Sequence, residues 1–114
     1  MIDLVSTSTD DVQTQRCAHL LAAVIAHAIV DAGSPMSLKE KEQHKAIGEP
    51  LVAIKWLFDK GTTFDLYCQL IGANAETVRN ALLGYHEIPK VGSGEFTEIN
   101  RRNLQARYRW TFGG

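Results

Sequence analysis

The sequence contains few of the residues that constrain small proteins by cross-links or by restricted backbone geometry. It has only two cysteines and three prolines among 114 residues. Two cysteines that lie far apart in apolar stretches exclude a disulfide framework and indicate a reducing compartment. With 45% hydrophobic and 22% charged residues, the composition also excludes disordered and collagen-like classes. Domains typically contain ~100–200 residues, so a chain of 114 residues has the length of one compact domain.

The chain also lacks an excess of charge of one sign and a hydrophobic run that could cross a bilayer. Twelve Lys and Arg residues against thirteen Asp and Glu leave a formal charge of -1, so no general basic field points to nucleic acid. The apolar stretch from Cys17 to Val30 contains two histidines and is shorter than the ~20 residues of a membrane helix. Residues 1–16 carry three aspartates against one arginine, unlike the positive leader of a signal peptide. We therefore expect a cytoplasmic protein without a membrane segment.

No arrangement of residues typical of catalysis or metal binding is visible. The four histidines are scattered, and none has a Cys, Asp or second His at the short spacing that a structural zinc site requires. His19 and His27 share a helix face, but they stand about two turns apart. Phosphate-binding loops, nucleophile elbows and paired carboxylates are also missing. We expect no cofactor, no metal and no enzymatic activity.

Periodicity and helix-end residues predict an all-α fold of five or six helices in one compact domain. We expect an N-terminal arm over residues 1–9 and a single helical domain over residues 10–112. The segment 85–96, which contains Pro89 and a Gly-Ser-Gly turn, is expected to be a loop or a small hairpin. The expected helices cover residues 10–32, 37–47, 50–60, 64–71, 75–83 and 97–112.

The first of these helices is apolar on all sides between Cys17 and Val30. One neighbouring helix cannot cover such a surface. We therefore expect this helix either to be central to the core or to form part of a dimer interface. In either case Cys17, His19 and His27 are expected to be buried.

The segment from Phe64 to Leu83 carries a recognisable spacing of small and branched residues. Cys68 is a small residue in the middle of the first helix, Gly72 follows four residues later, and Val78 follows six residues after that. This segment resembles the helix-turn-helix of bacterial and phage DNA-binding proteins. Tyr67 is larger and Ala81 is smaller than the residues usual at their positions in that motif. Ile71 and Leu82 extend the same apolar set.

The resemblance implies that the second helix of the motif lies in the major groove with its first turns against the base edges. Its outward positions would be Ala75, Glu76, Thr77, Arg79 and Asn80. Asn can pair with adenine, Glu can accept from cytosine, and Arg can contact guanine or a phosphate. The alternative is a surface helix in which Glu76 complements the helix dipole while Arg79 and Asn80 are solvated.

The last segment is rich in arginine and aromatic residues. Between Arg101 and Phe112 there are four arginines and no acidic residue. Arginines and aromatic rings together suit phosphates and unstacked bases. The alternative, which we favour for the aromatic residues, is that they pack on the core while the arginines remain in water. The residues concerned are Arg101, Arg102, Arg107 and Arg109, and Tyr108, Trp110 and Phe112.

The combination of an apolar helix, a helix-turn-helix and an arginine-rich tail resembles short regulatory proteins of phage and prophage genomes. It implies a DNA-binding transcriptional regulator that reads double-stranded DNA as a homodimer, because two-fold pairing doubles base and phosphate contacts. The alternative is a protein-interaction module, such as a phage-type factor that binds and inhibits a host protein. The balance of charge in the chain favours this alternative.

Overall fold

The computed structural model describes the backbone of residues 2–84 and 96–113 and the side chains of residues 16–84 and 96–113. Within these ranges the chain forms six α-helices and no strand, which confirms the predicted all-α fold. The segment 85–95, expected to be a loop or hairpin, lies outside the described residues. The helices are α1 (Ile2–Ala32), α2 (Leu38–Gln43), α3 (Glu49–Phe58), α4 (Thr63–Leu70), α5 (Ala75–Leu82) and α6 (Glu98–Phe112).

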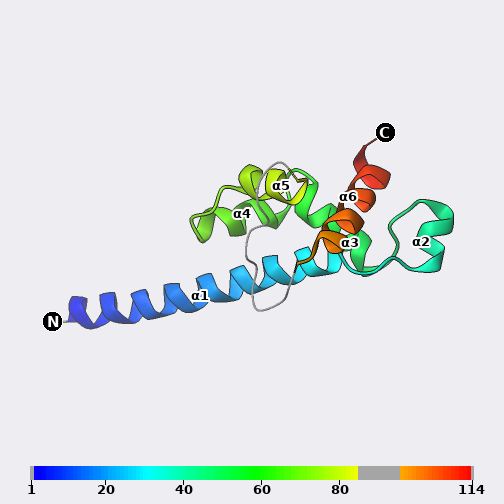
Figure 1. Ribbon diagram of the computed structural model, residues 1–114. Coiled ribbons are helices and arrows are strands. Elements are labelled where there is room, and N and C mark those ends of the chain that lie inside the picture. The colour runs from blue at the N-terminus through cyan, green and yellow to red at the C-terminus, as the bar shows by residue number, and fades with distance from the viewer. Residues whose placement is uncertain (1, 85–95, 114) are drawn as a thin grey trace.

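Helix α1 determines the shape of the molecule. It is a single helix of 31 residues whose N-terminal part extends past all the other helices (Figure 1). The molecule consequently measures 64 × 28 × 25 Å. The arm expected over residues 1–9 is helical from Ile2 onward. The helix begins earlier than the predicted start at residue 10, because Ser, Thr and Asp favour a helix start but do not prevent a helix from continuing through them.

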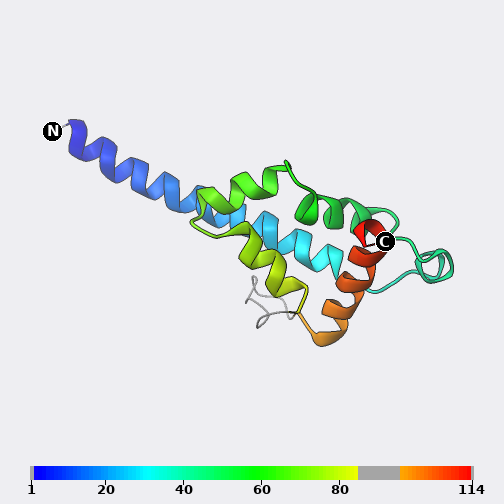
Figure 2. The same ribbon diagram turned by 90° about the horizontal axis from the view of Figure 1, so that it is seen from above.

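The hydrophobic core lies at the C-terminal end of α1, where α3, α4, α5 and α6 surround it (Figure 2). Helix α3 runs beside α1 and makes its most extensive packing contact. The fully buried residues of this core include Ile29, Ile54, Leu57, Phe64, Leu82 and Leu104. Cys68 is buried as expected, whereas Cys17, His19 and His27 are exposed. The chain does not itself bury these three residues, because only one face of α1 contacts its other helices.

Capping residues set the ends of the shorter helices. Ser37 and Glu40 form a capping box at the start of α2, and Thr97 and Asn100 form a second one at the start of α6. Helix α2 ends at Gln43, earlier than expected, because His44 adopts a left-handed conformation with φ of 51°. The Glu40 side chain then accepts a hydrogen bond from the Ile47 backbone N–H at 3.2 Å. This bond holds the connection to α3 in a non-helical path.

Candidate nucleic-acid interface

Helices α4 and α5 follow one another along the chain and pack together. Each contains eight residues, and residues 71–74 join them. Gly72 has φ of 78°, in the left-handed region that favours glycine, and a Cβ built there meets nothing within 4 Å. The Ala73 N–H donates to the Cys68 carbonyl at 2.8 Å and closes the turn. The Asn74 side chain accepts from Thr77 N at 3.0 Å and caps α5.

The side chains that the motif requires on its inner face are in the core. Cys68 and Leu82 are buried, and Ile71 and Val78 are half-buried and pack against the central cluster. Burial raises the pKa of the Cys68 thiol, which therefore remains uncharged at neutral pH. Tyr67, the large residue of the motif, packs edge-on against Trp56 of α3 with ring centroids 5.7 Å apart. Tyr67 is only half-buried, so its large ring lies at the edge of the core.

Arg79 is not on the outward face of α5, contrary to expectation. Only 7% of the residue is exposed. Its Nε donates to the Leu57 carbonyl at 2.7 Å, its Nη1 donates to Glu76 Oε1 at 2.6 Å, and its Nη2 lies 2.9 Å from Asp65 Oδ1. The guanidinium carbon also lies 5.0 Å from the centre of the Phe64 ring. Arg79 therefore fixes α5 against α3 and α4 and has no free edge for a base.

Three of the four remaining residues expected on the outward face of α5 are polar and accessible. Glu76, Thr77 and Asn80 are exposed, and Ala75 is half-buried. The Glu76 carboxylate is engaged by Arg79. Thr77 and Asn80 are thus the two side chains on this helix whose hydroxyl and amide groups face solvent beside the turn.

Helix α6 adjoins the C-terminal end of α5. Gln105 Nε2 donates to the Leu83 carbonyl at 2.9 Å, which links α6 to the residue that follows α5. A shallow pocket of about 260 Å³ lies at this junction and is lined by Leu83, Gln105, Tyr108 and Arg109. Arg102 and Arg109 are exposed, and Arg101 is partly buried with its Nη1 3.9 Å from Glu98 Oε2.

Arg107, the fourth arginine of the tail, is completely buried. It was expected to remain in water or to contact phosphate. Instead its Nε and Nη2 each donate to the Glu40 carboxylate at 3.0 Å. Its Nη1 donates to the Ala32 and Ser34 carbonyls at 2.9 and 2.6 Å, and its Nη2 also donates to the Pro35 carbonyl at 3.2 Å.

The contacts of Glu40 shift the pKa of its carboxyl group. Burial raises the pKa of its carboxyl group, but the hydrogen bonds from Arg107 and from the Ser37 and Ile47 backbone N–H groups outweigh that effect. The pKa falls to about 2. The Glu40 carboxyl group is therefore ionised throughout the physiological pH range, and its contacts with Arg107 join α6, α2 and the end of α1.

The aromatic residues of α6 pack on the protein, as we favoured. Tyr108 meets Phe58 edge-on with ring centroids 4.7 Å apart, and Trp110 meets His44 at 5.8 Å. Phe112 contacts Tyr108 at 5.5 Å but remains 39% exposed. These rings secure α6 to α3 and to the end of α2.

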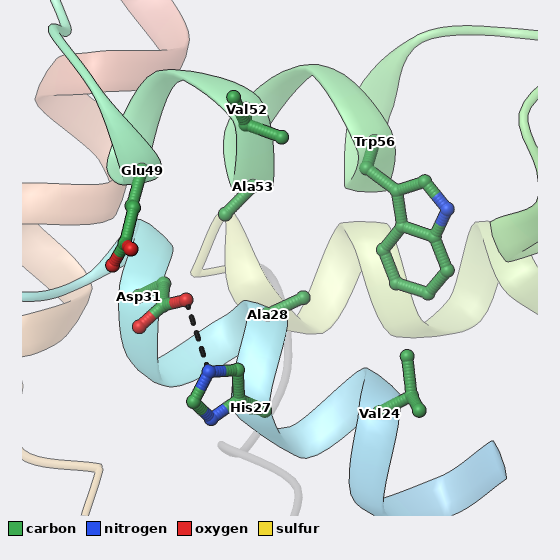
Figure 3. Close-up of a pocket in the computed structure, with 8 residues that line it drawn as sticks. All are labelled: Val24, His27, Ala28, Asp31, Glu49, Val52, Ala53 and Trp56. Carbon is green, nitrogen blue, oxygen red and sulfur yellow. Dashed lines mark ion pairs between the residues drawn. The ribbon is translucent and has the colours of Figure 1, made fainter.

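A second concave surface, which the sequence did not predict, lies between α1 and α3. This groove has a volume of about 350 Å³, and Trp56 extends from α3 toward Val24 of α1 (Figure 3). His27 Nε2 lies 3.3 Å from Asp31 Oδ2 at one side of the groove. Its lining is mainly apolar and consists of Val24, His27, Ala28, Asp31, Glu49, Val52, Ala53 and Trp56.

Among the residues whose side chains the structure describes, no group of three or more His, Cys, Asp or Glu residues could hold a metal ion. In the same part of the chain, no helix is long and apolar enough to span a membrane. No family model, curated protein or solved structure matches this chain significantly.

Proposed function

We propose that this protein binds double-stranded DNA through α5 and the exposed arginines of α6, as a phage- or prophage-type transcriptional regulator. The observation that carries the proposal is the pair of eight-residue helices joined at a positive-φ glycine, with polar residues outward on the second helix. A short helix with an exposed polar face fits the major groove of B-DNA.

The contacting residues differ in part from those expected from the sequence. Thr77 and Asn80 face solvent and would contact base edges. Arg79 and Arg107 are excluded as contacts because their guanidinium groups are bonded inside the protein. Arg102 and Arg109 are exposed and would neutralise phosphates beside the α5 helix.

The experiment measures affinity by fluorescence anisotropy across a salt series, on a duplex selected from a random library and on a scrambled duplex. Asn80→Ala should cost ~1–3 kcal/mol on the selected duplex and leave binding to the scrambled duplex nearly unchanged. Arg102→Ala should weaken binding to both duplexes and reduce the slope of log affinity against log salt by about one.

Lys39→Ala is the matched control for Arg102→Ala. Lys39 is exposed on α2, and α2 lies beyond α3 and α6, away from α5 (Figure 1). Lys39→Ala should leave the slope of log affinity against log salt unchanged. If the parent protein shows no salt-dependent binding to either duplex at micromolar concentration, the proposal of DNA binding is wrong.

A second candidate is a protein-interaction module that binds and inhibits a host protein. The exposed apolar side chains of α1 and α3 favour it, since Leu20 and Val52 are 67% and 68% exposed. The anisotropy experiment distinguishes the two candidates. A DNA-binding protein shows an affinity for duplex DNA that falls with salt, whereas a protein-interaction module shows no such binding.

A further inference from the structure

The outer face of α1 is apolar but is not covered by any described helix of the chain. Leu20 and Val24 are 67% and 47% exposed, and Cys17 is exposed on the same side. These residues recur at spacings of three and four, so they form one stripe along the helix. On α3, Val52 and Trp56 continue the apolar surface across the groove. We call this combined surface the α1–α3 face.

The amount of exposed surface is larger than a compact monomer requires. The chain exposes 7780 Å². A folded monomer of this mass exposes about 6,200 Å². The projecting α1 helix accounts for the extended shape in both views (Figures 1 and 2).

The two ends of the stripe carry charges of opposite sign. Arg16 is exposed and stands eight residues before Val24, about 12 Å along the helix. Asp31 stands seven residues after Val24, about 10 Å along the helix in the other direction, and Glu49 lines the groove at that end. A two-fold axis near Val24 therefore brings Arg16 of each copy beside Asp31 and Glu49 of the other.

We infer that the α1–α3 face binds a second copy of this chain, with the two α1 helices antiparallel. In this arrangement Leu20 of each copy covers the groove of the other and contacts the Val52 and Trp56 surface. The interface is isologous, because the same residues serve both copies. A parallel pairing would bring Arg16 beside Arg16 and Asp31 beside Asp31. The inference does not depend on DNA binding.

The first test is sedimentation equilibrium of the full chain. The parent protein should be a dimer, and Leu20→Glu should raise the dimer dissociation constant at least tenfold because the new carboxylate meets an apolar groove next to Asp31. Leu38→Glu is the matched control, since Leu38 is 72% exposed on α2, away from this face. It should leave the dissociation constant unchanged. Circular dichroism confirms that both variants are folded.

The second test is a charge exchange that reports orientation. Arg16→Asp and Asp31→Arg should each weaken the dimer, and the double variant should restore it to within about threefold of the parent. Rescue is expected only if residues 16 and 31 meet across the interface. Two single variants as tightly dimeric as the parent would overturn the antiparallel arrangement.

Cross-linking separates the antiparallel from the parallel pairing. Antiparallel helices hold the two Cys17 residues about 21 Å apart along the axis, so a short bismaleimide should not join them. The double variant Cys17→Ser, Val24→Cys should cross-link efficiently, because residue 24 lies near the two-fold axis. Cys68 is buried and does not interfere. Cross-linking of the parent at Cys17, or a parent that is still monomeric at a protein concentration of about 0.1 mM, would overturn the proposal.

Discussion

Arg107 connects more of the protein than any other side chain that the structure describes in detail. Its guanidinium group reaches the Glu40 carboxylate and three backbone carbonyls, of Ala32, Ser34 and Pro35. A buried charge is tolerated only where its donors are satisfied, and here the rigid fork of the guanidinium supplies bidentate pairing. Lysine would not reproduce this geometry.

We expect Arg107→Met to destabilise the protein by about 3–5 kcal/mol, because it leaves the buried Glu40 carboxylate without its cation. Urea unfolding followed by tryptophan fluorescence measures the change. Arg109→Met is the control, since Arg109 is exposed on the same helix and should change stability by less than about 0.5 kcal/mol. Equal effects of the two variants would show that the buried pair contributes nothing specific.

The depressed pKa of Glu40 predicts a loss of stability in acid. The pKa is about 2 in the folded protein against an ordinary value of 4.5. The folded state therefore gains stability above pH 4.5 and loses it as the pH falls toward 2, on the order of 3 kcal/mol in all. Urea unfolding at pH 6 and pH 3 should show this loss in the parent and a smaller loss in Glu40→Gln. Glu42→Gln, on the exposed side of α2, should behave as the parent.

Gly33 ends α1 where the backbone of α6 approaches closely. A Cβ at this position would lie 2.7 Å from the Asn100 carbonyl oxygen and 2.8 Å from Phe96 Cε2. Asn100 Nδ2 also donates to the Gly33 carbonyl at 2.9 Å. We expect Gly33→Ala to cost about 1–3 kcal/mol in thermal or urea unfolding, because the backbone of α6 must move. No measurable change would mean that α6 does not pack this closely.

At the scale of elements, the sequence predicted most helix ends from their capping residues. Ser37, Thr62, Asn74 and Thr97 each cap a helix in the structure. These contacts join residues two or three positions apart, so local sequence determines them. The roles of Arg79 and Arg107 could not be predicted in the same way. Their partners Leu57 and Glu40 lie 22 and 67 residues away, and a charged residue in a polar stretch gives no sign of burial.

The turn between α4 and α5 depends on Gly72. A side chain at positive φ costs about 1–2 kcal/mol, and a β-branched residue is strained most. Gly72→Val should therefore lower the melting temperature by roughly 5–10 °C. The open space around this position means that the cost comes from the backbone alone. A midpoint within about 2 °C of the parent would contradict the left-handed turn.

At the scale of the whole molecule, the projecting helix makes the monomer extended. The radius of gyration is 16.5 Å, against about 13 Å for a compact chain of this length. An isolated helix is only marginally stable in water. In hydrogen exchange, we expect the amides of residues 16–24 to be better protected in the parent than in Leu20→Glu. Equal protection in both proteins would show that α1 is stable without a partner.

The long reach of Arg107 also has a consequence for synthesis on the ribosome. The carbonyls of Ala32, Ser34 and Pro35 accept hydrogen bonds from Arg107, which the ribosome adds 72 to 75 residues later. At ~5–20 residues per second, translation of that interval takes several seconds. During this time α1 and α3 can pair, but the junction beneath α6 is still exposed to chaperones and proteases. Formation of the junction beneath α6 is therefore a late event that follows the emergence of α6.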